Sequence, residues 1–413
     1  MSEVAGETRE SLARDCLGHL RVLELCNLVA GPYCGKLLAD LGAEVIKIEP
    51  PGVGDAARRR GPFPGDDPHP EKSALYLYLN TNKLGVTLDV TTESGRGVFR
   101  QLVRQSDVLV EDNAPAVMEG LGLTYGDLRK INERLVVVSL TPFGQIGPYR
   151  GFRAHELNCF HAGGEGYLLP IESDLPDREP VRGGGLEADC ICGLCAALGG
   201  LGAVYTMKAT GKGQHVDVAK QEVLMAMVGL DMCVYTYSST VRTRHSRGAI
   251  LPTPVSCRDG YTMITPWPDP AWQAFARVMN KTAWVEDERF QGVIKRREQA
   301  EEISAEVREW ASRYEKQDLF HRLQGNGVAA APVNTAADIV ESPQMQARGF
   351  FREIDRSHVG NMAYPFVPYV FSATPCRLRR PAPLLGQDNE VVFCGRLGYG
   401  PRDLAAMVEA GVI

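Results

Sequence analysis

Hydrophobic and polar positions near the start of the chain follow a strand–helix–strand order. Residues 21–26 and 43–49 are short apolar runs typical of strands, and residues 27–42 between them fit a loop and a helix that ends at Gly42. Two strands joined by a helix within about thirty residues form a βαβ unit, which implies parallel strands. The loop contains Ala30-Gly31-Pro32 and lacks the Gly-x-Gly-x-x-Gly fingerprint of dinucleotide sites.

The same alternation continues along the next hundred residues. Together these segments predict an α/β fold with an open parallel sheet and helices on both faces. From about residue 220 the pattern becomes mainly helical, which predicts a smaller second domain, and Asp259-Gly260 predicts a hairpin turn there. The expected strands lie at 75–90, 107–112 and 135–140, and the expected helices at 92–103, 128–132, 220–239, 270–280, 296–325 and 402–410.

One long uncharged run stands apart from this alternation. Residues 190–207 contain no charged side chain, and Asp189 stands directly before them. Eighteen such residues reach the length of a membrane helix, but four are glycine and few are large aliphatics, so no membrane span is expected. Asp189 then has two interpretations. It is an N-cap of the helix, or it is a working carboxylate at the positive end of that helix.

Composition narrows the class of protein. The 413 residues suffice for two or three domains, and the formal net charge of −6 disfavours a nucleic-acid-binding protein. No charged leader followed by an apolar segment opens the chain, so a cytoplasmic location is expected. The eleven cysteines show no disulfide spacing, and Cys192-x-x-Cys195 has no matching second pair, so neither a bound metal nor a permanently bound cofactor is expected.

Short motifs in a fixed order resemble the class III CoA-transferases, also called the CaiB/BaiF or formyl-CoA transferase family. Each is weak alone, but together they run from residue 21 to the C-terminal region. The matching strings include Arg21-Val-Leu-Glu-Leu, Ala30-Gly31-Pro32, Leu41-Gly-Ala-Glu-Val-Ile-Lys-Ile-Glu49, Asn82-Lys83 with Leu88-Asp89, Asp107-Val-Leu-Val-Glu111, Thr210-Gly-Lys-Gly-Gln, Val216-Asp-Val, Ala331-Pro332-Val333-Asn334 and Ala382-Pro383-Leu-Leu-Gly386.

The resemblance implies a fold with two domains and an interlocked, ring-like dimer. The expected segments are a flexible N-terminus at 1–17, a large Rossmann-like domain at 18–225, a smaller α+β domain at 226–344, and a segment at 345–413 that returns to the large domain. The partners implied are an acyl-CoA, a carboxylic acid, and a second identical or homologous subunit.

The resemblance also implies the chemistry. It places the nucleophile at Asp189, with Glu156 as a second acidic residue of the site. A carboxylate can attack a thioester directly, which gives an aspartyl anhydride and then an aspartyl-CoA thioester without ATP. The residues that it places against coenzyme A are Val29, Ala30, Leu88, Asp112 and Arg153.

Several positions depart from the family pattern. Basic or amide residues that hold CoA in many members are replaced here by Pro50, Leu84, Asp112 and Gly120, and the glycine-rich lid has no counterpart at 250–262. Each lost charge-assisted contact is worth about 1.5–3 kcal/mol, and a carboxylate at Asp112 is expected to repel phosphates.

Two explanations follow for this reduced CoA cradle. Other groups hold CoA, such as Arg58–Arg60 and Arg153, or the chain is the non-catalytic subunit of a heteromeric transferase of the benzylsuccinate type, from anaerobic aromatic degradation. A third interpretation is an α-methylacyl-CoA racemase with the same fold, with His155 or His161 as its base. A purely structural partner chain is a fourth.

Overall fold

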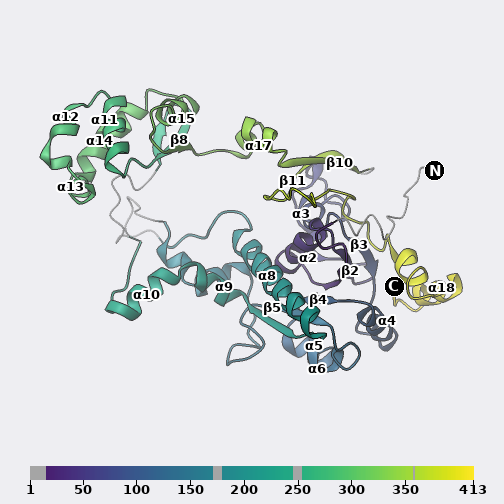
Figure 1. The fold of residues 1–413 in the computed structure, drawn as a ribbon. Helices are drawn as coiled ribbons and strands as arrows, with labels where there is room; N and C mark the ends of the chain where they lie inside the picture. The colour runs from purple at the N-terminus through teal and green to yellow at the C-terminus, as the bar shows by residue number, and fades with distance from the viewer. Residues whose placement is uncertain (1–14, 171–178, 245–253, 357–358) are drawn as a thin grey trace. The chain divides into compact units, whose positions relative to one another are not determined.

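The computed structural model describes residues 15–170, 179–244, 254–356 and 359–413. They divide into two compact units (Figure 1). Unit 1 comprises the described residues of 1–165, 183–228 and 347–413, and unit 2 those of 166–182 and 229–346. The chain therefore leaves unit 1 twice, after Glu165 and after Val228, and returns to it at Gly183 and at Ala347.

A parallel sheet forms the centre of unit 1. Among the described residues it has six strands in the order β3-β2-β1-β4-β5-β6, and every neighbouring pair in it is parallel. The predicted α/β class with an open parallel sheet is confirmed. The strands are β1 (Arg21–Leu25), β2 (Glu44–Glu49), β3 (Leu84–Thr87), β4 (Val108–Glu111), β5 (Val136–Thr141) and β6 (His215–Ala219).

The strand predicted at 75–90 is wrong over its first half, which is a helix. Ser73 caps α3 (Ala74–Leu79) by accepting a hydrogen bond from the Tyr76 N–H at 3.3 Å. Asn82 then adopts a positive φ of 65°, which turns the chain into the short strand β3. Apolar alternation over this stretch concealed the cap and the turn, which are the signals that separate helix from strand here.

Helices cover the two faces of the sheet. Val137 lies in a core cluster with Phe99 of α4 and Met118 of α5, whereas its neighbour Val138 faces α8, because a Cβ added at Gly200 would lie 3.1 Å from Val138 Cγ2. Alternate residues of one strand therefore pack against different helix layers. Besides α3, the α-helices of unit 1 before Val228 are α2 (Ala30–Asp40), α4 (Glu93–Arg104), α5 (Pro115–Leu121), α6 (Tyr125–Leu128), α7 (Glu156–Ala162), α8 (Glu187–Thr210) and α9 (Lys220–Met227).

Helix α8 contains the uncharged run and packs along α2, β5 and β6 (Figure 1). By length and composition it could cross a membrane, yet residues on one side of it, among them Ala196, Val204 and Met207, are buried in this unit. Small residues make the close approach feasible. A Cβ at Gly193 would overlap the Ala30 carbonyl oxygen and lie 3.2 Å from Cys34 N.

The returning segment completes the edge of the sheet beside β3. Asp388 accepts a hydrogen bond from the Gly85 N–H at 2.7 Å, and Asn389 accepts one from the Thr87 N–H at 2.9 Å. These contacts cover part of an edge that would otherwise expose backbone donors. The segment contains the antiparallel pair β10 (Phe351–Arg356) and β11 (Gly360–Pro365), then α18 (Pro401–Glu409).

The flexible segment predicted at 1–17 lies mostly outside the described residues, but its last part is held in place. Asp15 forms an ion pair with Arg379 of the returning segment at 2.5 Å. The Leu17 N–H donates to the Leu41 carbonyl at 2.9 Å, and the Leu17 side chain is buried.

Unit 2 has an aromatic core beside a small antiparallel sheet of β7, β8 and β9. Arg258 and Asp259 form the two-residue loop of the hairpin between β7 and β8, one residue before the predicted Asp259-Gly260 turn. Trp272 and Trp284 stack in its core with ring centroids 5.5 Å apart. Its elements are α10 (Gly229–Ser238), β7 (Val255–Cys257), β8 (Gly260–Ile264), α11 (Asp269–Val278), α12 (Ala283–Glu286), α13 (Val293–Glu298), α14 (Ala300–Ala311), α15 (Lys316–Gln324), β9 (Ala330–Pro332) and α16 (Ala336–Val340), with α17 (Pro343–Arg348) at the boundary to unit 1.

The packing of α8 on α2 predicts opposite effects for two glycine substitutions in one helix. Gly193→Ala should lower the free energy of unfolding by about 1–3 kcal/mol, because the new methyl group meets backbone atoms of α2 that cannot turn away. Gly202→Ala should instead raise it by about 0.5–1 kcal/mol, since no atom lies within 4 Å of that Cβ and alanine favours a helix. Thermal melting with amide exchange in α2 and α8 measures both. Equal effects of the two substitutions would contradict this packing.

Candidate active site

The candidate site lies at the carboxyl ends of β1, β4 and β6. The order of the sheet reverses direction between β1 and β4, and in open parallel sheets this is where ligands bind. Three chain segments meet there: the residues after β1 that lead into α2, Asp112 directly after β4, and Lys220 directly after β6. The start of α8 adjoins them through the contact of Gly193 with α2.

Asp189 is not the cap of its helix. Helix α8 begins at Glu187 after Leu186, and no side chain caps it, so Asp189 is the third residue within the first turn. The N-cap interpretation is therefore wrong. The side chain points into the protein, with only 8% of the residue exposed. Its place in the first turn puts its negative charge at the positive end of the helix dipole.

Lys220 forms an ion pair with Asp189, with 2.8 Å between Lys220 Nζ and Asp189 Oδ1. Both side chains are largely buried, at 16% and 12% exposure. Burial alone would lower the pKa of Lys220, but the charge and hydrogen bond of Asp189, with a contribution from Asp112, raise it above its usual value. The ammonium is therefore charged at neutral pH.

Lys220 was not predicted as a site residue from the sequence. A signal for it was present, since Lys220 follows the strand at 215–219 directly and the carboxyl ends of parallel strands share one edge. What the sequence could not supply was the pairing. Lys220 and Asp189 are 31 residues apart, and only the packing of α9 against α8 brings them together.

The start of α2 lies next to both Asp189 and Asp112. Val29 and Ala30 are buried, and Ala30 contacts α8 at Gly193. A Cβ added at Gly31 would lie 2.9 Å from Asp112 Oδ2. The structure thus brings Val29, Ala30 and Asp112 into the neighbourhood of Asp189.

Asp112 is held by backbone rather than by a cation. The Asn27 N–H donates to both of its carboxyl oxygens at 3.1 Å. Loss of water contact raises the pKa of Asp112 from 3.8 to about 8, and the hydrogen bond of Asn27 and the charge of Lys220 compensate only in part. Most of this carboxyl is therefore protonated at neutral pH, so the expectation that it repels phosphates does not hold there.

The cysteines near the site are thiols rather than thiolates. Burial raises the pKa of Cys192 to about 12 and the pKa values of Cys159 and Cys190 to about 11. A thiol in this state is a poor nucleophile and a poor metal ligand. The described residues also contain no cluster of histidine, cysteine and carboxylate side chains that could hold a metal ion.

The remaining predicted residues lie at different distances from this centre. Glu156 opens α7 one turn before Cys159, and its charge acts on the pKa of that thiol together with the charges of Lys220 and Asp189. Arg153 is exposed on the loop before α7. The Leu88 side chain is buried in the core with Phe99 and its N–H donates to the Glu49 carbonyl, so it is not gathered with Asp189.

The two histidines offered as racemase bases are exposed rather than directed into the core. His155 precedes α7, and His161 packs edge-on against Phe160 in its last turn. Within the described residues, Asp189 forms its ion pair with Lys220 and not with a histidine.

The expectation that Arg58 contacts CoA phosphates is wrong. Arg58 is fully buried, and its guanidinium donates to Glu49 at 2.7 Å and to Glu71 at 2.8 Å. Its charge is fully used inside unit 1, whereas Arg59 and Arg60 are exposed. The lid region at 250–262 lies partly outside the described residues.

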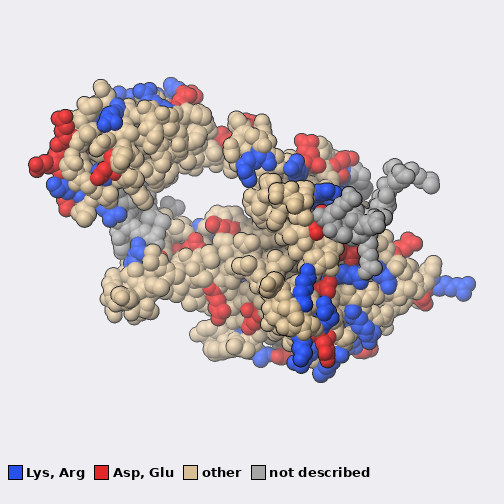
Figure 2. All heavy atoms as spheres, viewed as in Figure 1, with Lys and Arg blue, Asp and Glu red and all other residues tan. Residues whose placement is uncertain are grey.

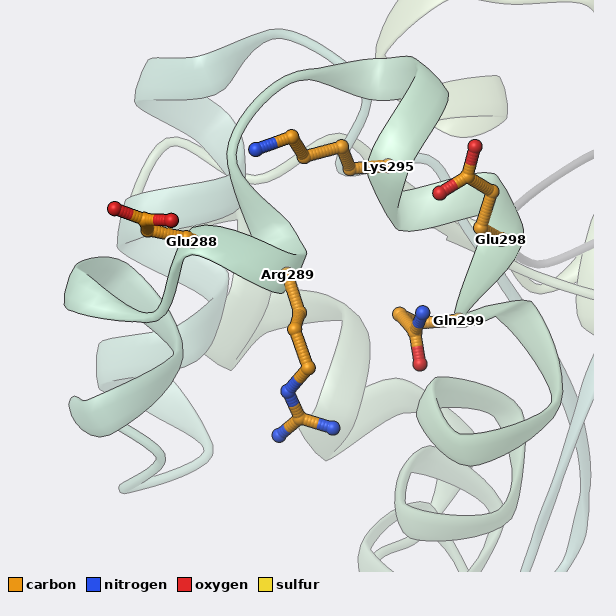
Figure 3. A pocket seen from close by; sticks show the side chains of 5 residues that line it. All are labelled: Glu288, Arg289, Lys295, Glu298 and Gln299. Atoms are coloured by element: carbon orange, nitrogen blue, oxygen red, sulfur yellow. The ribbon is translucent and has the colours of Figure 1, made fainter.

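Unit 2 has a pocket of about 260 Å³ that contains none of the predicted site residues (Figure 3). Its lining carries two acidic and two basic side chains, which gives it no net attraction for the phosphates of CoA. Figure 3 shows these side chains spread around the rim rather than converging on one point. They are Glu288, Arg289, Lys295, Glu298 and Gln299.

Comparisons with known proteins agree on one family. Residues 17–389 match the family model described as CoA-transferase family III. The chain is 31% identical to succinyl-CoA–D-citramalate CoA-transferase of Chloroflexus aurantiacus, over 96% of this chain and 98% of the relative. It is also 31% identical to the BbsE subunit of succinyl-CoA:(R)-benzylsuccinate CoA-transferase of Thauera aromatica, over 93% and 95%.

A solved structure agrees as well. The crystal structure of a CaiB/BaiF family protein from Brucella suis is 31% identical and superimposes with a TM-score of 0.79, over 91% of this chain and 98% of the other.

The raised pKa of Asp112 predicts how stability changes with pH. Between about pH 4 and 8 the folded chain keeps a proton on Asp112 that the unfolded chain has lost. The contribution of Asp112 to the free energy of unfolding is therefore fully present below about pH 4 and is lost progressively as the pH rises to about 8. Asp112→Asn should become more stable relative to the wild type over this window, by at most about 1.4 kcal/mol per pH unit.

Denaturant unfolding at several pH values measures this difference, with Asp67→Asn at an exposed site as the control. A constant difference between Asp112→Asn and the wild type from pH 4 to 8 would show that Asp112 is ionised throughout.

Proposed function

The chain belongs to CoA-transferase family III, and from this we propose that it moves coenzyme A from an acyl-CoA, such as succinyl-CoA, to a carboxylic acid, with Asp189 as the nucleophile. The observation that carries the proposal is the state of Asp189. Its carboxylate is largely buried, lies in the first turn of α8, and is paired with an ammonium group at the carboxyl edge of the sheet.

The chemistry needs a carboxylate and no base. An oxygen of Asp189 attacks the thioester carbonyl, the C–S bond breaks, and CoA leaves as thiolate from an aspartyl anhydride. The thiolate then attacks the Asp189 carbonyl and expels the donor acid, which leaves an aspartyl-CoA thioester. The acceptor acid repeats these two steps in reverse order and leaves with CoA.

The start of α2 supports the binding of CoA beside Asp189. Val29 and Ala30 precede or open this helix, whose first N–H groups and positive dipole end favour anionic groups. Asp112, protonated in part at neutral pH, places little negative charge next to it. We propose Val29, Ala30 and Asp112 as contacts of CoA, with Arg153 from the loop before α7 and Leu88 through its backbone.

The choice of donor follows the relatives. Both curated relatives described above act on succinyl-CoA by name, although their acceptor acids differ. We propose a succinyl-CoA-type donor for this chain.

A second subunit is part of the proposal. Helix α10 has no buried residue. Large hydrophobic side chains on it are exposed, with Leu230 at 69% and Tyr237 at 97%. Figure 2 shows the surface around α10 as largely uncharged. We propose that another copy of the chain, or a homologous one, covers this surface. The homologous case is favoured by one of the relatives, which is itself named as a subunit.

The proposal predicts a covalent mark on one residue. Incubation of the purified chain with succinyl-CoA, followed by hydroxylamine, should convert Asp189 to a hydroxamate that peptide mass spectrometry assigns. Asp189→Asn should abolish this mark and reduce CoA transfer at least about a thousandfold, because the nucleophile is gone. Glu187→Gln is the matched control, since it removes an exposed carboxylate of the same helix turn.

The same experiment with a co-purified homologous chain separates the two subunit arrangements. A mark on Asp189 of this chain alone supports a self-sufficient enzyme, and a mark confined to the partner supports the non-catalytic subunit. Transfer of CoA with no mark on either chain would refute the covalent mechanism.

A further inference from the structure

Lys220 is fixed beside Asp189 by the backbone on both of its sides. It follows Ala219, which pairs with Thr141 in the sheet, and it is the first residue of α9. Its carbonyl lies 3.8 Å from the Cys192 thiol of α8, and the Gln221 N–H donates to the Pro142 carbonyl at 3.1 Å. These contacts fix the backbone position from which the Lys220 side chain reaches Asp189, with 2.8 Å between Lys220 Nζ and Asp189 Oδ1.

The charges around Lys220 leave Asp189 as its counterion. The groups that act on the pKa of Lys220 are Asp189 and Cys192 on α8 and Asp112 after β4. Cys159 on α7 is influenced in turn by Lys220, Asp189 and Glu156, and Glu156 lies one turn before it on the same helix. The two thiols are uncharged, and Asp112 is protonated in large part at neutral pH. The carboxylate in direct contact with the ammonium is that of Asp189, at 2.8 Å.

The proposed reaction removes that charge from Asp189. In the anhydride and in the aspartyl-CoA thioester the residue is neutral, and Lys220 would be left as a largely buried cation without a partner. A buried charge without a partner is strongly unfavourable. In the same steps one new anion appears: the CoA thiolate when the anhydride forms, and the released carboxylate when the thioester forms. The number of negative charges in the site stays the same.

We propose that Lys220 is the counterion of the whole acyl-transfer cycle, pairing first with Asp189 and then with the thiolate or carboxylate that each step releases. This inference rests on the proposed function. Lys220 keeps its proton throughout, because neither bond exchange consumes or releases one. By holding the released anion beside the acylated residue, it lowers the energy of charge development and keeps the thiolate in place for its return attack.

Substitutions at Lys220 test this role. Lys220→Met should lower kcat for CoA transfer about 10²–10³-fold, the effect of losing one fixed donor to a developing anion, with a much smaller change in KM. Lys220→Arg should retain activity within about tenfold, since it keeps the charge. Added methylammonium should partly restore Lys220→Ala but not Asp189→Asn. Lys212→Met, in the exposed turn after α8, is the control and should transfer CoA as the wild type does.

The outcomes separate this inference from the proposed function. If the hydroxamate forms on Asp189 of the wild type but Lys220→Met transfers CoA at the wild-type rate, the counterion role is refuted and the proposed function stands. If the wild type neither marks Asp189 nor transfers CoA, the function itself fails. If Lys220→Met does not fold, Lys220→Arg and the methylammonium series decide. Loss of activity in Lys220→Arg without any rescue of Lys220→Ala would mean that Lys220 acts only on the fold.

Discussion

The close packing of α8 against α2 is the constraint on which the site depends. Gly193 faces the backbone of Ala30 and Cys34 with no room for a side chain, and Gly199 and Gly200 bring the same helix close to the sheet. This approach places the first turn of α8 at the carboxyl edge of the strands, where Asp189 meets a lysine from the end of β6. A helix of larger residues would stand farther from the sheet, and its first turn would not reach that edge. The small, uncharged composition of residues 190–207, which resembles a membrane span, is better explained by this packing.

The site around Asp189 contains fewer buried charges than other parts of unit 1. Elsewhere in unit 1 buried charges are matched in dense groups, such as Lys47 between Glu24 and Asp55 at 2.9 and 2.7 Å. Next to Asp189 a single ammonium faces one ionised carboxylate, while Asp112 and the thiols are neutral in large part at neutral pH. In a network of several buried ion pairs, each charge is held by more than one partner. In an isolated ion pair such as Lys220–Asp189, the ammonium can exchange one anion for another. That difference is what a reaction passing through two anionic leaving groups requires.

Local patterns in the sequence were sufficient for the parallel sheet and for most of the helices, because strand and helix periods are properties of neighbouring residues. They failed at 75–90, where a serine cap and a turn at Asn82 outweigh apolar alternation. They placed Asp189 at the start of the right helix but assigned it a capping role, because a cap and a first-turn carboxylate differ by a few residues. The ion pairs Lys220–Asp189 and Arg58–Glu49 could not be predicted in the same way. Each joins residues of different elements, and a single sequence does not show which elements pack together.

The central claim is that Asp189 takes part covalently, and oxygen transfer tests it most directly. When an acceptor acid labelled with ¹⁸O attacks the aspartyl-CoA thioester, one of its oxygens bridges to Asp189 and stays there after the thiolate departs with the acyl group. A single turnover with labelled acceptor should therefore leave one heavy oxygen on Asp189, detected in the peptide that contains it. Transfer of CoA to the labelled acid with Asp189 unlabelled would contradict the account.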